Sequence, residues 1–313
     1  MDTDGAVAIF SHSVYPSAEA MAMHQMNQQE SDRAAYSLAR TFLLHSGAAR
    51  GVTPDVLEKY LHLSTPRPDT IAGLYKRMLE SAQAGNMNAG VIGGSIGGVG
   101  KLGTVLCDFE PVRVLEKYPS GWEDVLDDIV RQLKPRGSVS RTSRSIWPRY
   151  CRSVLSGARL LSRFSSAEDF YGWVDLFDED ERARPALPLL LAQEIEGIGF
   201  ALACDFLKEL GYENFSKPDV HVKEIFWATE LSPFGTSDYE VFGAVARVAR
   251  NASVTAYNVD KLFWLIGSGY FYEDPHVGKR GRIGSQKKAF IEVAKAQLEA
   301  DQTLKGAGLD GDT

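Results

Sequence analysis

Two glycines separated by one residue, Gly197 and Gly199, interrupt a run of helical periodicity and constrain the fold of this 313-residue chain more than any other feature. A turn that tight requires residues without a Cβ atom. Apolar residues recur at helical spacing on both sides of it, at Leu191, Ile195, Ile198, Leu202, Phe206 and Leu210. The pattern predicts two short helices joined by a glycine hairpin, with Gly211 ending the second helix.

A third helix is predicted shortly after this pair. Ser216, Lys217 and Pro218 lead to Asp219, which stands where that helix would begin. A carboxylate at such a position accepts hydrogen bonds from unpaired amides and faces the positive end of the helix dipole. Elsewhere the periodicity is helical and no strand alternation is apparent, so we expect an all-α protein.

The order of helix, glycine hairpin, helix and helix-capping Asp resembles the helix-hairpin-helix DNA glycosylases. The signature of that family is Leu-Pro-Gly-Val-Gly, followed one helix later by Val-Asp-X-His-Val. Residues 195–199, Ile-Glu-Gly-Ile-Gly, match the first part, and residues 218–222, Pro-Asp-Val-His-Val, match the second. Glu196 departs from the pattern, because the family has proline there.

The resemblance implies an enzyme that flips a modified or mispaired base out of DNA and hydrolyses its N-glycosidic bond, leaving an abasic site. Asp219 matches the catalytic carboxylate, which stabilises positive charge on the sugar and orients water. Ala201 occupies the position where strand-cutting members carry a nucleophilic Lys. Because alanine cannot attack the sugar, the resemblance implies a monofunctional glycosylase without lyase activity.

The resemblance also assigns contacts with double-stranded DNA. Backbone amides at a helix N-terminus hold a phosphate without reading sequence, and here they would belong to Gly197, Ile198 and Gly199. His221 matches a family position that meets phosphate. No cofactor is implied, although the hairpin could hold a monovalent or divalent cation.

The base pocket is expected beside Ala201. Asp205 lies one turn further along the same helix face, where it could accept a hydrogen bond from an exocyclic amine or simply face solvent. Trp147 is one of several aromatic residues that could stack on an extruded base or belong to the core.

A glycine-rich stretch covers residues 91–109. It fails the P-loop pattern, because Ser95 stands where the first glycine is needed, and a Gly-X-Gly-X-X-Gly match at 98–103 lacks a strand–turn–helix context. We interpret it instead as the family's wedge helix, with Ser95 and Ile96 near the opened base stack and Lys101 directed at phosphate. Each glycine within a helix costs about 1 kcal/mol, so DNA or a neighbouring helix must approach this backbone closely.

The net charge of −7 would disfavour a nucleic-acid partner if it were evenly spread. However, residues 131–164 contain nine basic side chains, residues 276–288 contain five, and neither segment contains Asp or Glu. Such segregation attracts phosphate locally, unless the segments are only solvated basic faces. We expect Arg280 and Arg282, in the second segment, to contact the DNA backbone.

Composition sets further limits. The three cysteines are far apart, which favours a reducing compartment and excludes a four-cysteine iron–sulfur cluster, and the six His show no metal-ligand spacing. No apolar run approaches the roughly 20 residues of a membrane span, and the N-terminus lacks the features of a secretory signal. We therefore expect a cytoplasmic protein that avoids membranes and has no metal site built from His or Cys side chains, and we expect it to be a monomer.

The domain prediction is one helical unit over residues 1–313. Residues 91–188 would form a lobe with the wedge helix and the first basic segment, and residues 189–227 the hairpin and the Asp219 helix. Residues 1–90 and 228–313 would form a second lobe and a C-terminal extension, with the active-site cleft between the lobes.

Alternatives remain open at this stage. The chain could be a helix-hairpin-helix DNA-binding protein that has lost catalysis, or a nucleotide-binding protein that uses residues 93–103. For a glycosylase, the excised base is undetermined, and both base-excision repair and defence against phage DNA with hypermodified bases fit.

Overall fold

The computed structural model describes residues 18–63, 66–85 and 91–307, and the side chains of residues 28–63, 66–85 and 91–297. Over these ranges the chain is all-α, as the sequence predicts, and extended pairing is limited to isolated bridges of Tyr270 and Gly278 with Arg282. None of the described helices combines the length and the apolar character that a membrane crossing needs. The expectations for the first 17 and the last six residues lie outside the described part.

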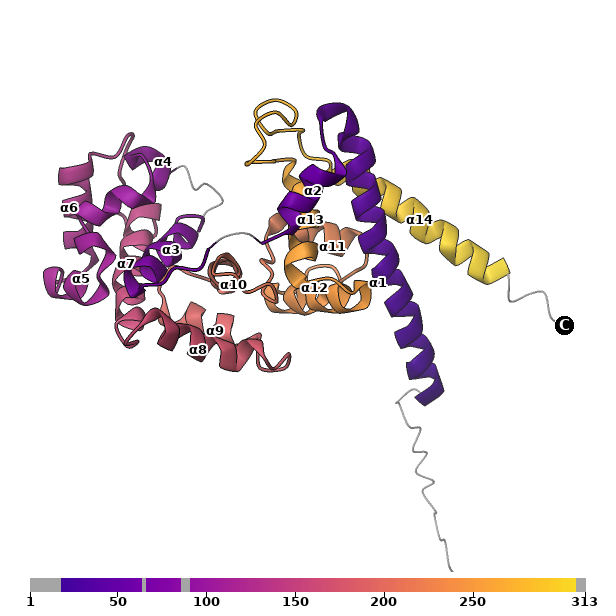
Figure 1. Ribbon diagram of the computed structural model, residues 1–313, viewed down its shortest axis with the longest axis horizontal. Coiled ribbons are helices and arrows are strands. Elements are labelled where there is room, and N and C mark those ends of the chain that lie inside the picture. Colours follow the sequence, from indigo (N-terminus) through magenta and orange to yellow (C-terminus); the bar gives the residue numbers. More distant parts are fainter. Residues whose placement is uncertain (1–17, 64–65, 86–90, 308–313) are drawn as a thin grey trace, which may run out of the picture.

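The buried apolar residues form two separate clusters. Core A consists of residues between 74 and 215 together with Phe242, and core B consists of residues 39–61 and 222–294. Figure 1 shows the corresponding helices on opposite sides of the molecule, with α10 between them. The helices of core A are α3 (Ile71–Ala82), α5 (Pro111–Lys117), α6 (Trp122–Leu133), α7 (Ile146–Leu161), α8 (Ala167–Asp178), α9 (Ala186–Glu194) and α10 (Phe200–Glu209). Those of core B are α1 (Ala18–Gly47), α2 (Pro54–Leu61), α11 (Val220–Ala228), α12 (Asp238–Ala252), α13 (Ala256–Ser268) and α14 (Lys287–Ala307).

Helix α7 is the centre of core A and contacts α3, α5 and α6. Gly157 permits the close approach of α3, because a Cβ atom there would lie 2.0 Å from Met78 Cε. This packing differs from the domain prediction, which assigned residues 71–82 to the second lobe. The apolar face of α3, with Leu74, Tyr75 and Met78, is buried in core A instead.

Core B is built around α13, whose N-terminus carries a capping box of Thr255 and Asn258. Asp32 of α1 is fully buried, and its carboxylate accepts hydrogen bonds from Arg247 and Asn251 of α12. This ion pair joins the N-terminal helix to the C-terminal half of the sequence.

The glycine-rich stretch is not the single helix that we predicted. It consists of a four-residue helix, α4 (Gly93–Ile96), and two short 3-10 turns, η2 (Val99–Thr104) and η3 (Cys107–Phe109). Gly97 and Gly98 adopt φ of 83° and 110°, which end α4. The glycines therefore serve turns rather than a continuous helix.

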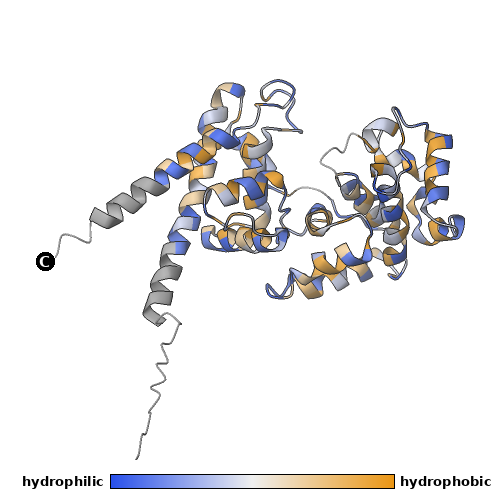
Figure 2. Cartoon of the chain, turned by 180° about the vertical axis from the view of Figure 1, so that it is seen from behind, coloured by the Kyte–Doolittle hydropathy of each residue, from blue (hydrophilic) through white to orange (hydrophobic). Residues whose placement is uncertain are grey.

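Leu176 of α8 and Leu189 and Leu190 of α9 are exposed, and Figure 2 colours the chain by the hydropathy of each residue.

Candidate functional site

The hairpin joins α9 to α10, as predicted, and Gly197 forms its turn. Gly197 has φ of 84°, and a Cβ atom there would lie 2.7 Å from Ser153 Oγ. Helix α7 fixes the turn from below, because Ser153 Oγ donates to the Glu196 carbonyl (2.6 Å) and Glu196 N donates to Ser156 Oγ (3.0 Å). Both backbone strain and steric contact therefore require glycine at this position.

Gly199 lacks a side chain for a different reason. Its φ of −93° and ψ of 177° are extended values that any residue adopts, so the turn does not require glycine here. A Cβ atom would meet nothing within 4 Å, and the residue is exposed. The missing side chain leaves open the approach to the first amides of α10, which have no intrahelical acceptors.

Asp219 is the N-cap of α11, as the sequence predicts. Its Oδ1 accepts hydrogen bonds from His221 N (2.8 Å) and Val222 N (3.1 Å). Nothing in the described part of the chain donates to Oδ2. Burial, together with the charge of Asp260, raises the pKa of Asp219 above its ordinary value, although the Val222 amide and the neighbouring Lys217 and His221 oppose this effect.

A cavity of about 370 Å³ lies where the chain passes from core A to core B. Helix α10 and the segment after it provide one part of the lining, and α13 and the loop after it provide the other. The lining residues are Asp205, Lys208, Glu209, Lys217, Asp260, Lys261, Trp264, Tyr270 and Tyr272. The volume falls within the range of about 300–1,000 Å³ that is typical of small-molecule sites.

Charged side chains connect this cavity to Asp219. Lys208 Nζ lies 2.8 Å from Asp260 Oδ2, which also accepts a hydrogen bond from the Lys217 amide at 2.9 Å. The Lys217 carbonyl in turn accepts from the Asp219 amide (2.7 Å). The segment that positions Asp219 is therefore held directly on a wall of the cavity.

The same charges set the protonation of the lining. Burial alone would raise the pKa of Asp205, but the ammonium groups of Lys217 and Lys208 outweigh it and lower that pKa to about 2. Lys261 behaves in the opposite way, because burial and then the charge of Lys208 lower its pKa. The cavity thus combines a firmly ionised carboxylate with a lysine that gives up its proton more readily than usual.

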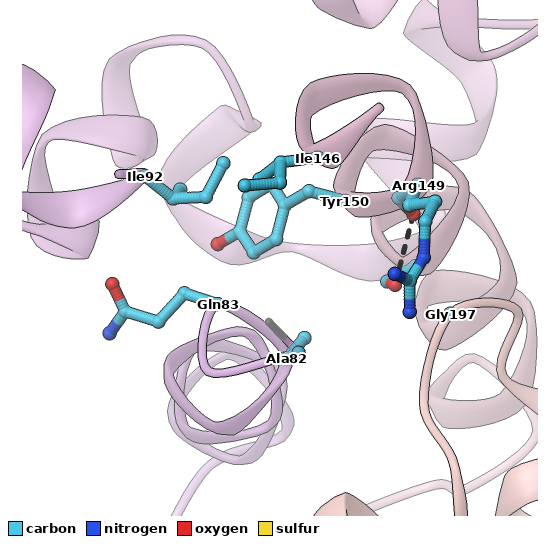
Figure 3. A pocket seen from close by; sticks show the side chains of 9 residues that line it. Ala82, Gln83, Ile92, Ile146, Arg149, Tyr150 and Gly197 are labelled. Carbon is cyan, nitrogen blue, oxygen red and sulfur yellow. Dashed lines mark hydrogen bonds between the residues drawn. The ribbon is translucent and has the colours of Figure 1, made fainter. Parts of the chain in front are cut away.

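A second, much smaller cavity adjoins Gly197. It has a volume of about 20 Å³ and is lined by the end of α3 and the start of α7, including Gln83, Arg149 and Tyr150 (Figure 3). A single water molecule needs about 10–15 Å³, so this cavity has room for about one water and cannot hold a nucleobase. The larger cavity is therefore the candidate for a base pocket.

Two predictions for base and wedge residues are wrong. Trp147 is only 4% exposed, packs edge-to-face on Tyr150 and belongs to core A, so it does not line the larger cavity. Ile96 is 9% exposed and also part of core A. Ser95, half-buried beside it, donates its hydroxyl to the Ile92 carbonyl.

The predicted DNA-contacting cations are exposed. Lys101 lies on η2, and Arg280 lies in the loop between α13 and α14. Arg282, in the same loop, stacks on Tyr270 with its guanidinium carbon 3.9 Å from the ring centroid. Because Tyr270 lines the cavity, Arg282 stands at its rim.

His221 is half-buried, and its ring packs against Gly267, where a Cβ atom would come within 2.5 Å. Its Nδ1 is buried and finds no hydrogen-bond partner in the described part of the chain. A phosphate contact for His221 stays a prediction.

In the first basic segment, several charges are already paired. Arg131, Arg141 and Arg163 form ion pairs with Asp128, Asp127 and Glu194 respectively. These pairs reduce the charge that residues 131–164 can offer to phosphate.

Sequence reasoning missed the three most unusual groups of the site, Lys208, Asp260 and Lys261. Each is less than a tenth exposed although charged. One signal was present: Asp260 and Lys261 are adjacent charges within the otherwise apolar helix α13. Charged residues are almost never fully buried unless they are paired.

No family model matches the sequence, and neither a curated protein nor a solved structure is similar enough to count as a relative. Within the described ranges, His, Cys, Asp and Glu side chains do not gather in a group of three that could hold a metal ion.

Proposed function

We propose that this protein is a monofunctional DNA glycosylase that hydrolyses the N-glycosidic bond of an extruded base. The observation that carries the proposal is Asp219, a half-buried helix cap whose pKa is raised by burial and which follows two residues after Lys217, a residue that lines a cavity large enough for a base. Surface caps do not need such an environment. Perturbed carboxylates beside cavities cluster at functional sites.

The chemistry assigned to Asp219 follows from its two oxygens. Oδ1 is fixed by the α11 amides, which orient the carboxylate, and Oδ2 is the oxygen that we assign to the substrate. As the bond to the base breaks, positive charge develops on the sugar, and a fixed anion stabilises it in a poorly solvated site. The base leaves with the bonding electron pair, water adds to C1′, and the proton that this water loses passes by way of the carboxylate or solvent to the departed base.

The hairpin supplies the proposed grip on the DNA backbone. Gly199 and Asp205 lie on the same helix, separated by about 9 Å along its axis at 1.5 Å per residue. A phosphate at the exposed α10 N-terminus would therefore place the neighbouring nucleotide close to the cavity. Arg282 and Arg280 would add contacts from the opposite rim.

Ala201, half-buried on α10, offers no nucleophile, so strand cleavage is not expected. Lys261 lines the cavity and has a lowered pKa, and a covalent adduct with DNA would implicate it. A catalytically inactive DNA-binding protein remains the second proposal. The glycosylase and the inactive binding protein would both use the hairpin to hold DNA, and they differ in the role of Asp219.

The test uses duplexes that each carry one damaged, mispaired or phage-type base. We expect one base to give strand breaks only after alkali, with no direct nick and no adduct trapped by borohydride. A direct nick or a trapped adduct would contradict the monofunctional assignment. If no base is released and Asp219→Asn binds DNA as wild type does, the inactive binding protein is favoured. The base that is released also decides between repair and defence against phage DNA.

A further inference from the structure

The larger cavity presents a hydrogen-bond acceptor that cannot donate. Asp205 has a side chain that is 14% exposed, and both nearby ammonium groups, Lys217 at 3.3 Å and Lys208 at 3.9 Å, approach its Oδ1. An ionised carboxylate has about four acceptor sites and no donor, so two lysines do not exhaust it. A carbonyl oxygen placed against Asp205 would be repelled, and an N–H group would be bound.

The cavity also presents a hydrogen-bond donor. Lys261, on α13, donates from Nζ to the Tyr272 hydroxyl at 3.1 Å. A lysine ammonium carries three donors and no acceptor. The rings of Tyr257, Trp264 and Tyr272 lie with centroids 5.2–5.5 Å from Nζ, and they restrict where the group can point.

Aromatic faces complete the lining. Trp264 and Tyr270 each pack edge-to-face with Tyr272, at centroid distances of 6.2 and 6.1 Å. Extruded bases are held by stacking on such side chains and by hydrogen bonds to their edges. A planar ligand that offers both a donor and an acceptor on one edge would satisfy all three parts of this lining.

Bases differ in this respect at one atom. Cytosine and adenine carry an exocyclic amine, a donor, where uracil, thymine and hypoxanthine carry a carbonyl, an acceptor. The amine of cytosine and adenine lies next to a ring nitrogen that accepts. Their edge therefore matches Asp205 and Lys261 together, whereas a carbonyl would face the carboxylate.

We infer that the cavity between α10 and α13 selects an extruded base with an exocyclic amine, which donates to Asp205 while a ring acceptor receives a hydrogen bond from Lys261. This inference rests on the proposed glycosylase function and adds the substrate class. Selection is by hydrogen bonding, and it extends to modified bases that keep the amine.

The test measures binding without cleavage, in the Asp219→Asn protein. Two pairs of duplexes carry cytosine or uracil, and adenine or hypoxanthine, opposite a tetrahydrofuran abasic analogue, so that no base pair must be broken. Fluorescence anisotropy should show the amine-bearing duplex bound about tenfold tighter in each pair, as expected for one hydrogen bond to a charged group. Equal affinity within both pairs, or a preference for the carbonyl, would overturn the inference.

Asp205→Asn, made in the Asp219→Asn protein, tests whether Asp205 is the residue that causes the preference for an exocyclic amine. The amide can offer N–H to a carbonyl, so the preference should vanish or reverse. Asp127→Asn is the control and should keep the preference. It removes an exposed carboxylate of α6 that pairs with Arg141. A preference that survives Asp205→Asn in a folded protein overturns the role of Asp205.

The two levels of failure are distinguishable. If wild type releases a base and the pairs are bound equally, the substrate class is wrong and the glycosylase stands. If the protein binds none of the duplexes and releases no base, the proposed function fails and the inference fails with it.

Discussion

Lys208 and Asp260 form a buried ion pair, with 2.8 Å between Nζ and Oδ2, that joins α10 of core A to α13 of core B. The pair also holds the segment leading to Asp219, because Asp260 accepts from the Lys217 amide. The relative position of the hairpin and the candidate catalytic carboxylate thus depends on one contact between the two cores.

Lys208→Met should destabilise the protein by about 3–5 kcal/mol, because it leaves the Asp260 carboxylate buried without its cation. Urea unfolding followed by circular dichroism measures the change. Arg250→Met is the control: its pair with Glu181 is more than half exposed on both sides, and exposed pairs contribute about 1 kcal/mol or less. Similar losses for the two variants would show that the inter-core pair has no special weight.

Asp219→Asn should abolish base release without lowering stability. Asparagine caps helices as well as aspartate does, so α11 is retained. The sign follows from the pKa: a carboxyl whose pKa is raised in the folded state contributes stability at low pH that is lost as pH rises through the transition. At neutral pH the ionised Asp219 is therefore unfavourable to folding, and the neutral amide should leave the melting temperature equal or higher. A clear drop would mean that the residue serves stability only.

As the pH is lowered, base release should be lost at a higher pH than it would be if Asp219 had the ordinary pKa of an aspartate. The reaction needs the ionised carboxylate, and the pKa of Asp219 lies above the ordinary value of 3.8. Single-turnover rates on the identified substrate should fall as pH decreases through this raised pKa. A rate that stays flat down to the ordinary range, in protein that remains folded, would contradict the assignment.

Much of this site could be predicted because its signals are local. The glycine hairpin and the Asp219 cap each follow from spacing and capping within about one helix. The pairing of Lys208 with Asp260 could not be predicted, since it joins residues 52 positions apart. The single helix expected over residues 91–109 also failed, because positive φ at Gly97 and Gly98 ends α4, and Ile96 is buried in core A. For Trp147 both a core and a pocket position stayed open, since periodicity alone does not distinguish a core aromatic from a pocket aromatic.

The two hairpin glycines should respond differently to alanine. Gly197→Ala places a Cβ atom 2.7 Å from Ser153 Oγ at positive φ, so it should destabilise the protein by about 1–3 kcal/mol. Gly199→Ala meets no neighbour and should leave stability unchanged, but it should weaken DNA binding by obstructing the α10 amides. Thermal melts and anisotropy with a plain duplex separate the two effects. Unchanged DNA affinity for Gly199→Ala would remove the hairpin from the interface.

Charge reversal at Arg280 and Arg282 should weaken binding to any duplex and flatten its salt dependence. Each phosphate contact that is lost lowers the slope of log K against log salt by about 0.9. Both residues are exposed, so Arg280→Glu and Arg282→Glu should not affect folding. Arg182→Glu, at a side chain that is 92% exposed in the loop before α9, is the matched control and should keep the wild-type slope. If the slope is the same in all three variants and wild type, the loop between α13 and α14 does not touch DNA, and the backbone contacts must come from the hairpin side alone.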